Sequence, residues 1–545
     1  MNHIIHDIDR DGWGSAALVI ADKHPENCRL YPVSEKEICG ILQSIEVEEG
    51  DVVWILDIPG PASWARFPIR NGVRTIWVDH HLNSWSQLPP PEIEVILPAG
   101  IKPTTTMHML VSNKLVHLQG AINFVHALCS REQKSEWGLV FDGLASLAPN
   151  FPVPVKDLPE LLARAPSGDS VPDRLKPAAS VAQEHAKTVE RVLDDSRIDV
   201  NEYSTVVYID DAHGIALRHF SLSTARRHPD KVVVLVHRST LLYCGTDSRN
   251  PRIDLFKYFQ ARGFKVKGHG YVCFITIAPE RIQPELDALN LALKQRKWLT
   301  DTISSAAQIR EKLQTRLQSD GHRVHFRPST GGVSMIGLLH ESPQLGKSGL
   351  SADAIVKDFE SLFEKHCNDR HKERDTGEKE LQSFLIREAY TNKRKMASIN
   401  AVSQGTRSPV ELIFVTDEIA LPTQTSKTVC DILAVRRDSK LGLVPVLLEL
   451  KNTRSLARLK EQVECYANLL DAHADLFEQL YSVLLGERIR FEGKTEKWIV
   501  WPASGLDSEP RESEFAQKGV RVVCYKQDIE KFSFSVGASP GDGTY

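Results

Sequence analysis

Short apolar runs that end at an acidic residue recur through the first 150 residues of the chain. HIIH precedes Asp7, VVWIL precedes Asp57, and TIWV precedes Asp79. Such runs, bounded by turn-forming residues, are typical of buried parallel strands. EWGLVF, before Asp142, has the same form and is expected to be a further strand. Because parallel strands present their carboxyl ends at one edge of a sheet, the pattern predicts an α/β domain with acidic side chains gathered at that edge.

The first run leads into an acidic turn, DIDRDG. Asp7, Asp9 and Asp11 are spaced by two, so an extended backbone would point their carboxylates to one side. Carboxylates placed in this way repel one another unless a cation lies between them. Gly12 permits a sharp turn and a close approach of the backbone. A solvated acidic loop is the alternative for this segment taken alone.

Asp79-His80-His81 directly follows the TIWV run. It would bring one carboxylate and two imidazoles to the same sheet edge as Asp57. Aspartates at strand ends are usually turn formers, but their repetition together with the histidines favours a dinuclear metal centre. Carboxylates with few imidazoles and no thiolate suit Mn²⁺ or Mg²⁺.

On the DIDRDG and Asp-His-His motifs, residues 1–150 resemble the DHH phosphoesterase superfamily in its RecJ-like form. The resemblance implies a parallel-sheet α/β domain that hydrolyses phosphodiesters with two Mn²⁺ or Mg²⁺ ions. It implies that His81 faces the scissile phosphate and that Asp57 bridges the two ions. Asp79 is counted with the metal group, although it is expected to orient its neighbours. The implied metal residues are Asp7, Asp9, Asp11, Asp57, Asp79, His80 and Asp142.

Three further runs, STVVYIDD, KVVVLVHRS and YVCFITIAPE, predict a smaller α/β domain over residues 201–290, after a connector at 151–200. The resemblance implies that this is the DHH-associated substrate-binding domain. KGHGY is similar to the glycine-rich loop of that domain, and an ordinary hairpin is the alternative. The implied substrate-binding residues are Arg249, Lys267, Gly268, His269 and Gly270.

A different pattern occupies residues 371–535. TVCDILAVRRDSKLGLVPVLLELKN predicts a hairpin with Asp431 before its first strand and Glu449 and Lys451 at the end of its second. A period of two places Glu449 and Lys451 on one face. LKEQVECYANLL predicts a following helix that carries Gln462, and GEKELQSFLIREAY predicts a preceding helix.

This arrangement resembles the PD-(D/E)XK nuclease superfamily, with its restriction-endonuclease-like α/β fold. The resemblance implies that Asp431 and Glu449 bind Mg²⁺, that Lys451 positions the attacking water or stabilises the phosphate, and that Gln462 assists. The helical glutamate of the family would be Glu378 or Glu380, and Glu378 is favoured. A hairpin with a surface ion pair is the alternative.

The bulk properties are those of an ordinary soluble α/β protein. The 545 residues suffice for several domains, and the formal net charge of −4 provides no global attraction to nucleic acid. Binding must then come from local basic patches such as TARRHPDK, LKQRKW and NKRKM. Nine cysteines without a C-x-x-C pair and the lack of a long apolar run favour a reducing cytoplasmic location, with no membrane contact. Residues 291–370 are expected to be a helical bridge and 536–545 a disordered tail.

These patterns together predict a nuclease with two metal-dependent centres. The first would cut the ends of single strands and the second would cut internally, with DNA favoured over RNA as partner. A homo-oligomer or a partner protein in prokaryotic DNA repair or anti-phage defence would fit this role. One alternative is that the first domain hydrolyses or senses a small nucleotide, such as a nanoRNA or a cyclic dinucleotide, and controls the second. Another is that the chain is a structural subunit that holds DNA.

Overall fold

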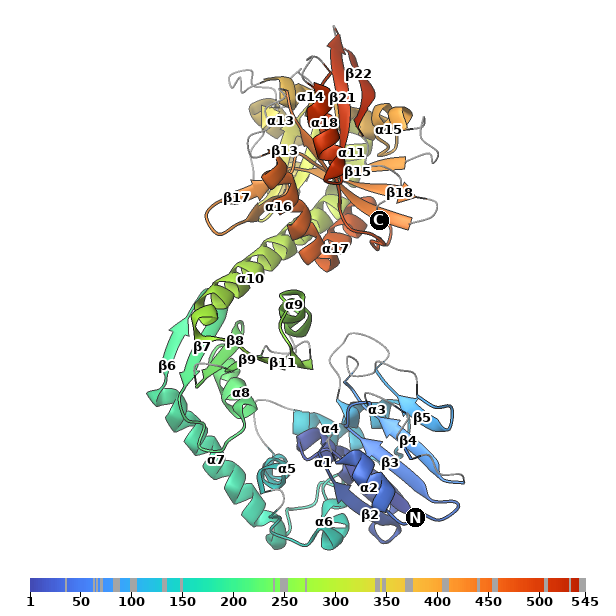
Figure 1. Ribbon diagram of the computed structural model, residues 1–545, viewed down its shortest axis with the longest axis vertical. Helices are drawn as coiled ribbons and strands as arrows, with labels where there is room; N and C mark the ends of the chain where they lie inside the picture. Colours follow the sequence, from blue (N-terminus) through green and yellow to red (C-terminus); the bar gives the residue numbers. More distant parts are fainter. Residues whose placement is uncertain are drawn as a thin grey trace. The chain divides into compact units, whose positions relative to one another are not determined.

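The computed structural model divides the chain into two compact units, Met1–Pro284 and Glu285–Tyr545 (Figure 1). The structure describes residues 1–34, 37–61, 64, 67–68, 72–81, 89–98, 105–129, 135–147, 150–238, 241–245, 253–269, 272–338, 344–345, 349–367, 376–403, 411–438, 442–452, 459–503, 508–528 and 531–538.

The first unit begins with a five-stranded parallel sheet in the order β2-β1-β3-β4-β5. Its strands are β1 (Asn2–His6), β2 (Cys28–Pro32), β3 (Val52–Leu56), β4 (Arg74–Val78) and β5 (Ile93–Ile96). Alternate side chains enter two cores, because Ile4 belongs to one buried cluster and Ile5 to another. The parallel sheet predicted from the apolar runs is therefore present, with both faces covered.

Helices cover the two faces of this sheet. They are α1 (Arg10–Lys23), α2 (Ile38–Ser44), α3 (Thr106–Ser112), α4 (Ala121–Cys129), α5 (Glu136–Leu147) and α6 (Leu158–Leu162), with 3₁₀ turns at Pro25–Asn27, Val155–Asp157 and Asp173–Leu175. Residues of α1, α3, α4, α5 and α6 share the core of Ile4, while Ile38 and Leu42 of α2 share the core of Ile5.

The prediction of a strand before Asp142 is wrong, because Glu136–Leu147 forms helix α5. Trp137, Val140, Phe141 and Leu144 are buried and recur at helical spacing. A short apolar run does not distinguish a buried helix from a buried strand. Asp142 consequently lies within a helix rather than at a strand end.

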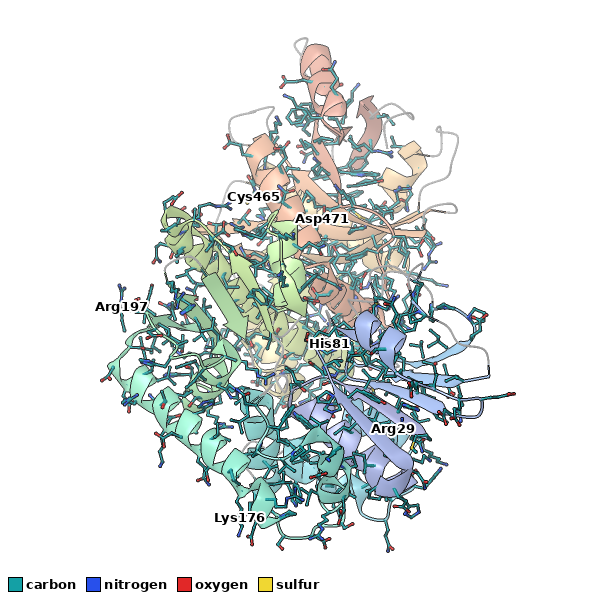
Figure 2. The ribbon with its side chains drawn as sticks, turned by 60° about the horizontal axis from the view of Figure 1, so that its bottom comes forward. Arg29, His81, Lys176, Arg197, Cys465 and Asp471 are labelled. Atoms are coloured by element: carbon teal, nitrogen blue, oxygen red, sulfur yellow. The ribbon has the colours of Figure 1, made fainter. Side chains whose placement is uncertain are left out.

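A long helix, α7 (Lys176–Asp195), leads to a second sheet. Figure 2 labels Lys176 at its start and Arg197 just beyond its end. The sheet has the order β10-β11-β9-β8-β7-β6, in which only β7 and β8 pair in parallel. Its elements are β6 (Arg197–Val200), β7 (Ser204–Ile209), α8 (Leu217–Arg227), β8 (Val232–His237), β9 (Leu241–Gly245), α9 (Leu255–Ala261), β10 (Lys267–His269) and β11 (Val272–Thr276). The three strands predicted between residues 201 and 290 are β7, β8 and β11.

Residues 291–370, expected to be a helical bridge, also contain a small antiparallel sheet in the order β12-β13-β14. The elements from here are α10 (Pro279–Gln308), a π-helical turn (Ile309–Leu313), α11 (Gln314–Asp320), β12 (Val324–Ser329), β13 (Gly332–Gly337), β14 (Gln344–Leu345), α12 (Ala352–Lys357) and α13 (Phe359–Cys367). β12 and β13 pair antiparallel and form a hairpin across the glycine-rich segment STGGVSMIG.

The second unit is built on a six-stranded sheet in the order β15-β18-β19-β20-β21-β22. Its strands are β15 (Glu411–Asp417), β18 (Ile432–Asp438), β19 (Gly442–Leu450), β20 (Glu496–Pro502), β21 (Val520–Asp528) and β22 (Lys531–Ala538), beside a small pair, β16 (Ala420–Pro422) and β17 (Lys427–Val429). The helices are α14 (Thr376–Thr391), α15 (Ala397–Ser403), α16 (Leu459–Ala472), α17 (Ala474–Leu485) and α18 (Ser508–Gln517).

The predicted hairpin is formed by β18 and β19, which pair antiparallel, whereas β19, β20 and β21 run parallel. The expected tail begins inside β22, which extends to Ala538, and residues 539–545 lie outside the described residues. Among the helices that the structure describes, none is both long and apolar enough to cross a membrane.

Candidate metal centres

The acidic turn after β1 is shaped by a glycine. Asp9 caps helix α1 and accepts a hydrogen bond of 3.0 Å from the Gly12 amide. A Cβ atom on Gly12 would lie only 2.1 Å from the carbonyl oxygen of Asp7. Only glycine therefore allows the turn to fold back closely enough to place Asp7 beside Asp9.

The start of helix α3 holds two more carboxylates in place. Asp11 accepts hydrogen bonds from the amides of Thr106 (2.8 Å) and Met107 (3.1 Å). The Thr106 hydroxyl donates to Asp57 Oδ1 at 2.8 Å. Asp57, directly after β3, has a φ of +61°, a strained conformation for a residue with a side chain. The chain thus bends sharply at the point where this carboxylate enters the site.

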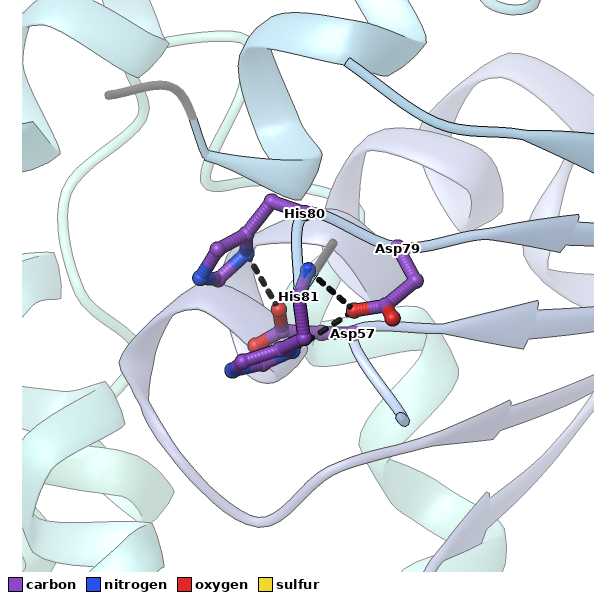
Figure 3. Close-up of side chains that lie close together, drawn as sticks. All are labelled: Asp57, Asp79, His80 and His81. Carbon is purple, nitrogen blue, oxygen red and sulfur yellow. Dashed lines mark hydrogen bonds and ion pairs between the residues drawn. The ribbon is translucent and has the colours of Figure 1, made fainter. Parts of the chain in front are cut away.

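The Asp-His-His segment lies at the end of the neighbouring strand β4 (Figure 3). His80 Nδ1 is 2.9 Å from Asp57 Oδ1 and 3.3 Å from Asp11 Oδ2. Asp79 Oδ1 accepts from the His81 backbone amide at 3.1 Å and lies 2.6 Å from its Nδ1. Asp79 therefore orients the His81 ring.

Two groups of ligand atoms converge here, each with all its atoms within 4.8 Å of one another. One consists of Asp7, Asp9 and Asp57, and the other of Asp57, Asp79, His80 and His81. Asp57 belongs to both groups. This is the geometry in which one carboxylate can serve two ions.

The electrostatics of these carboxylates fit a cation site. Burial, and then the charge of Asp9, raises the pKa of Asp7 to about 6. Burial and the charges of Asp11 and Asp9 raise the pKa of Asp57 well above its usual value. Burial opposes protonation of His80, but hydrogen bonds to Asp11 and Asp57 raise its pKa to about 11. Divalent cations would relieve this repulsion, so the donor set fits Mn²⁺ or Mg²⁺.

Asp142 belongs to neither group. It forms an ion pair with Arg10, in which Arg10 Nε lies 3.0 Å from Asp142 Oδ1 and a second contact joins Nη2 to Oδ2. The two residues are far apart in the sequence, so nothing local in either segment indicates the pair. Arg10 is a site residue that the motif analysis missed, although it lies inside DIDRDG.

A cavity of about 650 Å³ in the first unit borders the acidic groups through Asp9 and Asp11. Its other walls come from α7 and α8 and are in part apolar, with Val189 and Leu222. Arg218 of α8 lies 3.3 Å from Asp9 Oδ2. The basic side chains in the lining are Arg10, His185, Arg218, His219 and Arg226.

The predicted substrate-binding residues do not line this cavity where they are described. Lys267 and Gly268 lie on β10 and are exposed. Gly268 has a φ of +110°, and a Cβ there would lie 2.3 Å from the Val272 carbonyl oxygen, so the close pairing of β10 with β11 requires glycine. Arg249, Gly270 and the side chain of His269 lie outside the described residues.

The C-terminal centre is assembled around a lysine. Lys451 Nζ lies 2.9 Å from Glu449 Oε1, 3.2 Å from Glu378 Oε1 and 3.9 Å from Asp431 Oδ2. Gln462 on α16 donates to Glu449 Oε1 at 2.7 Å. The structure thus brings together all five residues predicted for this site.

Glu378 and Glu380 have different surroundings. Glu378 contacts Lys451 at the site, whereas Glu380 accepts a hydrogen bond of 2.9 Å from Gln527. Of these two contacts, only that of Glu378 joins the cluster around Lys451, and its role as the helical glutamate stays a prediction.

Burial and the neighbouring Glu449 raise the pKa of Asp431 to about 8. Burial opposes the charge of Lys451, but Glu449 and Asp431 raise the lysine pKa above its usual value. One lysine faces three carboxylates, so the site retains excess negative charge and its oxygen donors fit Mg²⁺ or Mn²⁺. Within the described part of the chain, these carboxylates do not form a group as tight as the two N-terminal ones.

Comparison with known proteins gives remote likenesses only. No protein-family model and no curated protein matches the chain. Similar solved structures include a pGpG-specific phosphodiesterase from Vibrio, at 12% identity and a TM-score of 0.37, covering 54% of this chain and 99% of that one. An exonuclease RecJ bound to manganese has 14% identity and a TM-score of 0.32, covering 53% and 88% of the two chains.

A third similar structure is RecJ of Thermus thermophilus with Mn²⁺, at 13% identity and a TM-score of 0.32, covering 84% of this chain and 64% of that one. Phosphoesterases of the DHH type are thus among the solved structures similar to about half of the chain. All these TM-scores lie below 0.5, so the proposals below depend on the geometry of the chain's own residues.

Proposed function

We propose that the chain is a metal-dependent phosphodiester hydrolase with two separate centres, one in each unit. The observation that carries the proposal is the buried Asp57, which belongs to both N-terminal ligand groups and has a raised pKa. A buried, repelling set of carboxylates is costly unless cations bind to it.

At the N-terminal centre, Asp7, Asp9 and Asp57 would hold one ion. Asp57 and His80 of the second group would hold the other, together with Asp11, which lies 3.3 Å from His80, while Asp79 and His81 of that group contact each other. Asp142 is proposed to join the second set only if its pair with Arg10 opens. When bound, such ions supply Lewis-acid activation of water and of the phosphoryl oxygens. His81, which Asp79 orients through Nδ1, is proposed to face the scissile phosphate and to donate a proton to the leaving oxygen.

The cavity beside this centre supports a substrate that carries phosphate. Arginine side chains recognise phosphate oxygens in a bidentate manner, and apolar walls accept a nucleobase. We therefore propose a nucleic-acid strand end as substrate, with DNA favoured over RNA. A volume of about 650 Å³ is that of a small-ligand pocket, which favours a second candidate, the hydrolysis of a di- or cyclic nucleotide.

At the C-terminal centre, we propose cleavage of the PD-(D/E)XK type. Asp431 and Glu449 would hold Mg²⁺ with help from Glu378, and Gln462 orients Glu449. Lys451 would hold the attacking water or the negative charge that develops on the phosphate. Joining this centre to a strand-end hydrolase suits the processing of DNA in repair or in defence against foreign DNA.

A substrate panel tests the proposal. Purified full-length protein with Mn²⁺ is incubated with end-labelled single strands, duplex, circular plasmid, dinucleotides, cyclic dinucleotides and pyrophosphate. If the parent protein releases mononucleotides and Asp57→Asn does not, the N-terminal assignment is supported. If the parent protein nicks plasmid and Lys451→Ala does not, the C-terminal assignment is supported. If the protein hydrolyses none of these substrates in the presence of Mn²⁺, both assignments are refuted.

A further inference from the structure

We propose that Arg327 and Asp417 are positioning residues for the C-terminal centre. The hairpin of β12 and β13, which carries Arg327, then helps to hold the residues of that site in place. This inference builds on the C-terminal activity proposed above. It concerns residues that lie outside the Asp431, Glu449 and Lys451 motif and belong to the region expected to be only a bridge.

Asp417, the last residue of β15, is fully buried (0% exposed) and is held by two side chains of β12. Arg327 donates from Nε to Asp417 Oδ1 at 2.9 Å and from Nη2 to Oδ2 at 2.5 Å. His325 Nε2 lies 2.8 Å from Asp417 Oδ1. Burial opposes the charge of Asp417, but Arg327 and His325 hold its pKa well below the usual range. The carboxylate is therefore ionised and fixed from two directions.

Gln382 connects this buried pair to the site. Its Nε2 atom donates to Asp417 Oδ2 at 3.0 Å and to the backbone carbonyl of Asp431 at 3.2 Å. Gln382 lies one turn after Glu378 on helix α14, so the same contact fixes the register of the helix that carries Glu378. A second link runs through the next residue, because the Glu418 amide donates to the Asp431 carbonyl at 3.3 Å.

Two of the three carboxylates around Lys451 thus depend on Asp417 for their positions. Asp431 is held through its own backbone, and Glu378 is held through α14. In the described part of the chain, no hydrogen bond or ion pair joins Arg327, Asp417 or Gln382 to Lys451, so their effect would pass through the hydrogen bonds above. Metal ligands placed by such outer contacts lose about 10- to 100-fold in metal affinity when the contacts are removed.

The same sheet offers a matched control. Arg436 of β18 forms a partly buried pair with Glu496 of β20, with Nη2 2.7 Å from Oε1. Among the residues that the structure describes, no hydrogen bond or ion pair joins Arg436 or Glu496 to Gln382 or Asp431. Replacing it tests the general cost of disturbing a buried ion pair in this unit.

The experiment compares full-length Arg327→Lys and Gln382→Leu with Arg436→Lys. The Mn²⁺ concentration that gives half-maximal plasmid nicking is measured, together with the thermal unfolding temperature. Arg327→Lys keeps the charge but loses the two-pronged contact. Gln382→Leu removes the connection, together with the hydrogen bond of 2.7 Å that Gln382 Oε1 accepts from Lys379. We expect both to need about tenfold more Mn²⁺ than the parent protein, while Arg436→Lys needs the same amount. An unchanged requirement in Gln382→Leu, or an equal rise in Arg436→Lys, would overturn the inference.

A binding measurement separates this inference from the proposed activity. Calorimetric titration of Mn²⁺ into the Asp57→Asn protein reports the C-terminal site without any substrate. If plasmid is not nicked but Gln382→Leu still weakens this binding about tenfold, the positioning role stands and the nuclease assignment fails. If Mn²⁺ binds equally well with and without Gln382, the positioning role fails.

Discussion

The two centres balance negative charge with different kinds of basic group. In the N-terminal centre, the basic group among the carboxylates is the imidazole of His80, itself a proposed metal ligand, which contacts Asp57 and Asp11, while Arg218 contacts Asp9. In the C-terminal centre, Lys451 lies among its carboxylates and contacts Glu449 and Glu378 directly.

This difference determines how much each site needs metal. A metal ion at the N-terminal centre would replace the proton of His80, because an imidazole that binds a metal is neutral. Lys451 is no metal ligand and keeps its charge when an ion binds beside it. The C-terminal site already holds one fixed positive charge, so it requires fewer ions. The comparison therefore predicts that the first unit is the more strongly stabilised by divalent ions, and that each centre can be inactivated without loss of the other.

Crossed substitutions test the independence of the two centres and should give the largest effect. Asp57→Asn should lower strand-end or dinucleotide hydrolysis by about 10³-fold and leave plasmid nicking intact, because it removes the carboxylate shared by both ligand groups. Lys451→Ala should do the reverse. The rates are measured for both substrates with both variants. A single substitution that abolishes both activities would break the comparison.

The glycine of the acidic turn provides a second test, confined to the N-terminal centre. Gly12→Ala should reduce its turnover by about 10- to 100-fold, because the new Cβ would lie 2.1 Å from the Asp7 carbonyl oxygen and force the turn apart. Gly40→Ala is the matched control, since nothing lies within 4 Å of a Cβ at that helical position. Equal turnover in the two variants would show that the turn does not determine the site.

Two adjacent arginines on α8 allow a test of whether the cavity binds the substrate. Arg226 lines it and forms no hydrogen bond or ion pair with the residues that the structure describes, whereas Arg227 pairs with Glu190 and Asp194. Arg226→Ala should raise the KM for a phosphorylated dinucleotide about tenfold, the value of one charge-assisted phosphate contact. Arg227→Ala should change KM less than twofold, and plasmid nicking should not respond to either. Equal KM values for the two variants would remove the cavity from substrate binding.

The last prediction concerns no catalytic rate but the stability of the second unit and its dependence on pH. Burial, and then the charge of Arg296, lowers the pKa of His473 to about 4. Its value in the unfolded chain is about 6.5, so the unfolded state binds a proton between these values and the folded state does not. Stability of the second unit should therefore fall as the pH drops from 6.5 to 4, by at most about 3 kcal/mol.

Hydrogen exchange of the β18–β21 amides measures this loss. His473→Gln should remove this dependence of stability on pH, because glutamine does not titrate. Glutamine can still donate to Gln295, as His473 Nε2 does over 3.0 Å. An identical pH slope in the variant would show that other groups cause the loss.

The parts of the fold that the sequence predicted are those with local signals. β3, β4 and the β18–β19 hairpin follow directly from apolar runs and their bounding polar residues. A period of two was enough to place Glu449 and Lys451 on one face, whereas the place of Gln462 beside them came only from the resemblance to the PD-(D/E)XK superfamily. Helix α5 was read as a strand, because six residues of EWGLVF carry too little periodicity to tell the two apart.

The contacts that were missed join residues distant in the sequence. Asp142 meets Arg10, and Arg327 meets Asp417, through packing that no local pattern encodes. No local pattern indicates the second pair either. His325 and Arg327 alternate with Val324 and Phe326, which is typical of a strand with one solvated face, yet all four residues are buried. The sequence TARRHPDK indicated a basic patch around Arg226. It did not indicate which of its two arginines lines a cavity.

The most direct measurement is a crystal structure of the full chain grown with Mn²⁺, with anomalous scattering used to locate the ions. The account predicts two anomalous peaks on either side of Asp57, one touching Asp7 and Asp9 and the other touching His80. If the peaks are absent while Asp7, Asp9, Asp57 and His80 keep the positions described above, the first unit does not bind two metal ions. Its assignment as a hydrolase is then wrong.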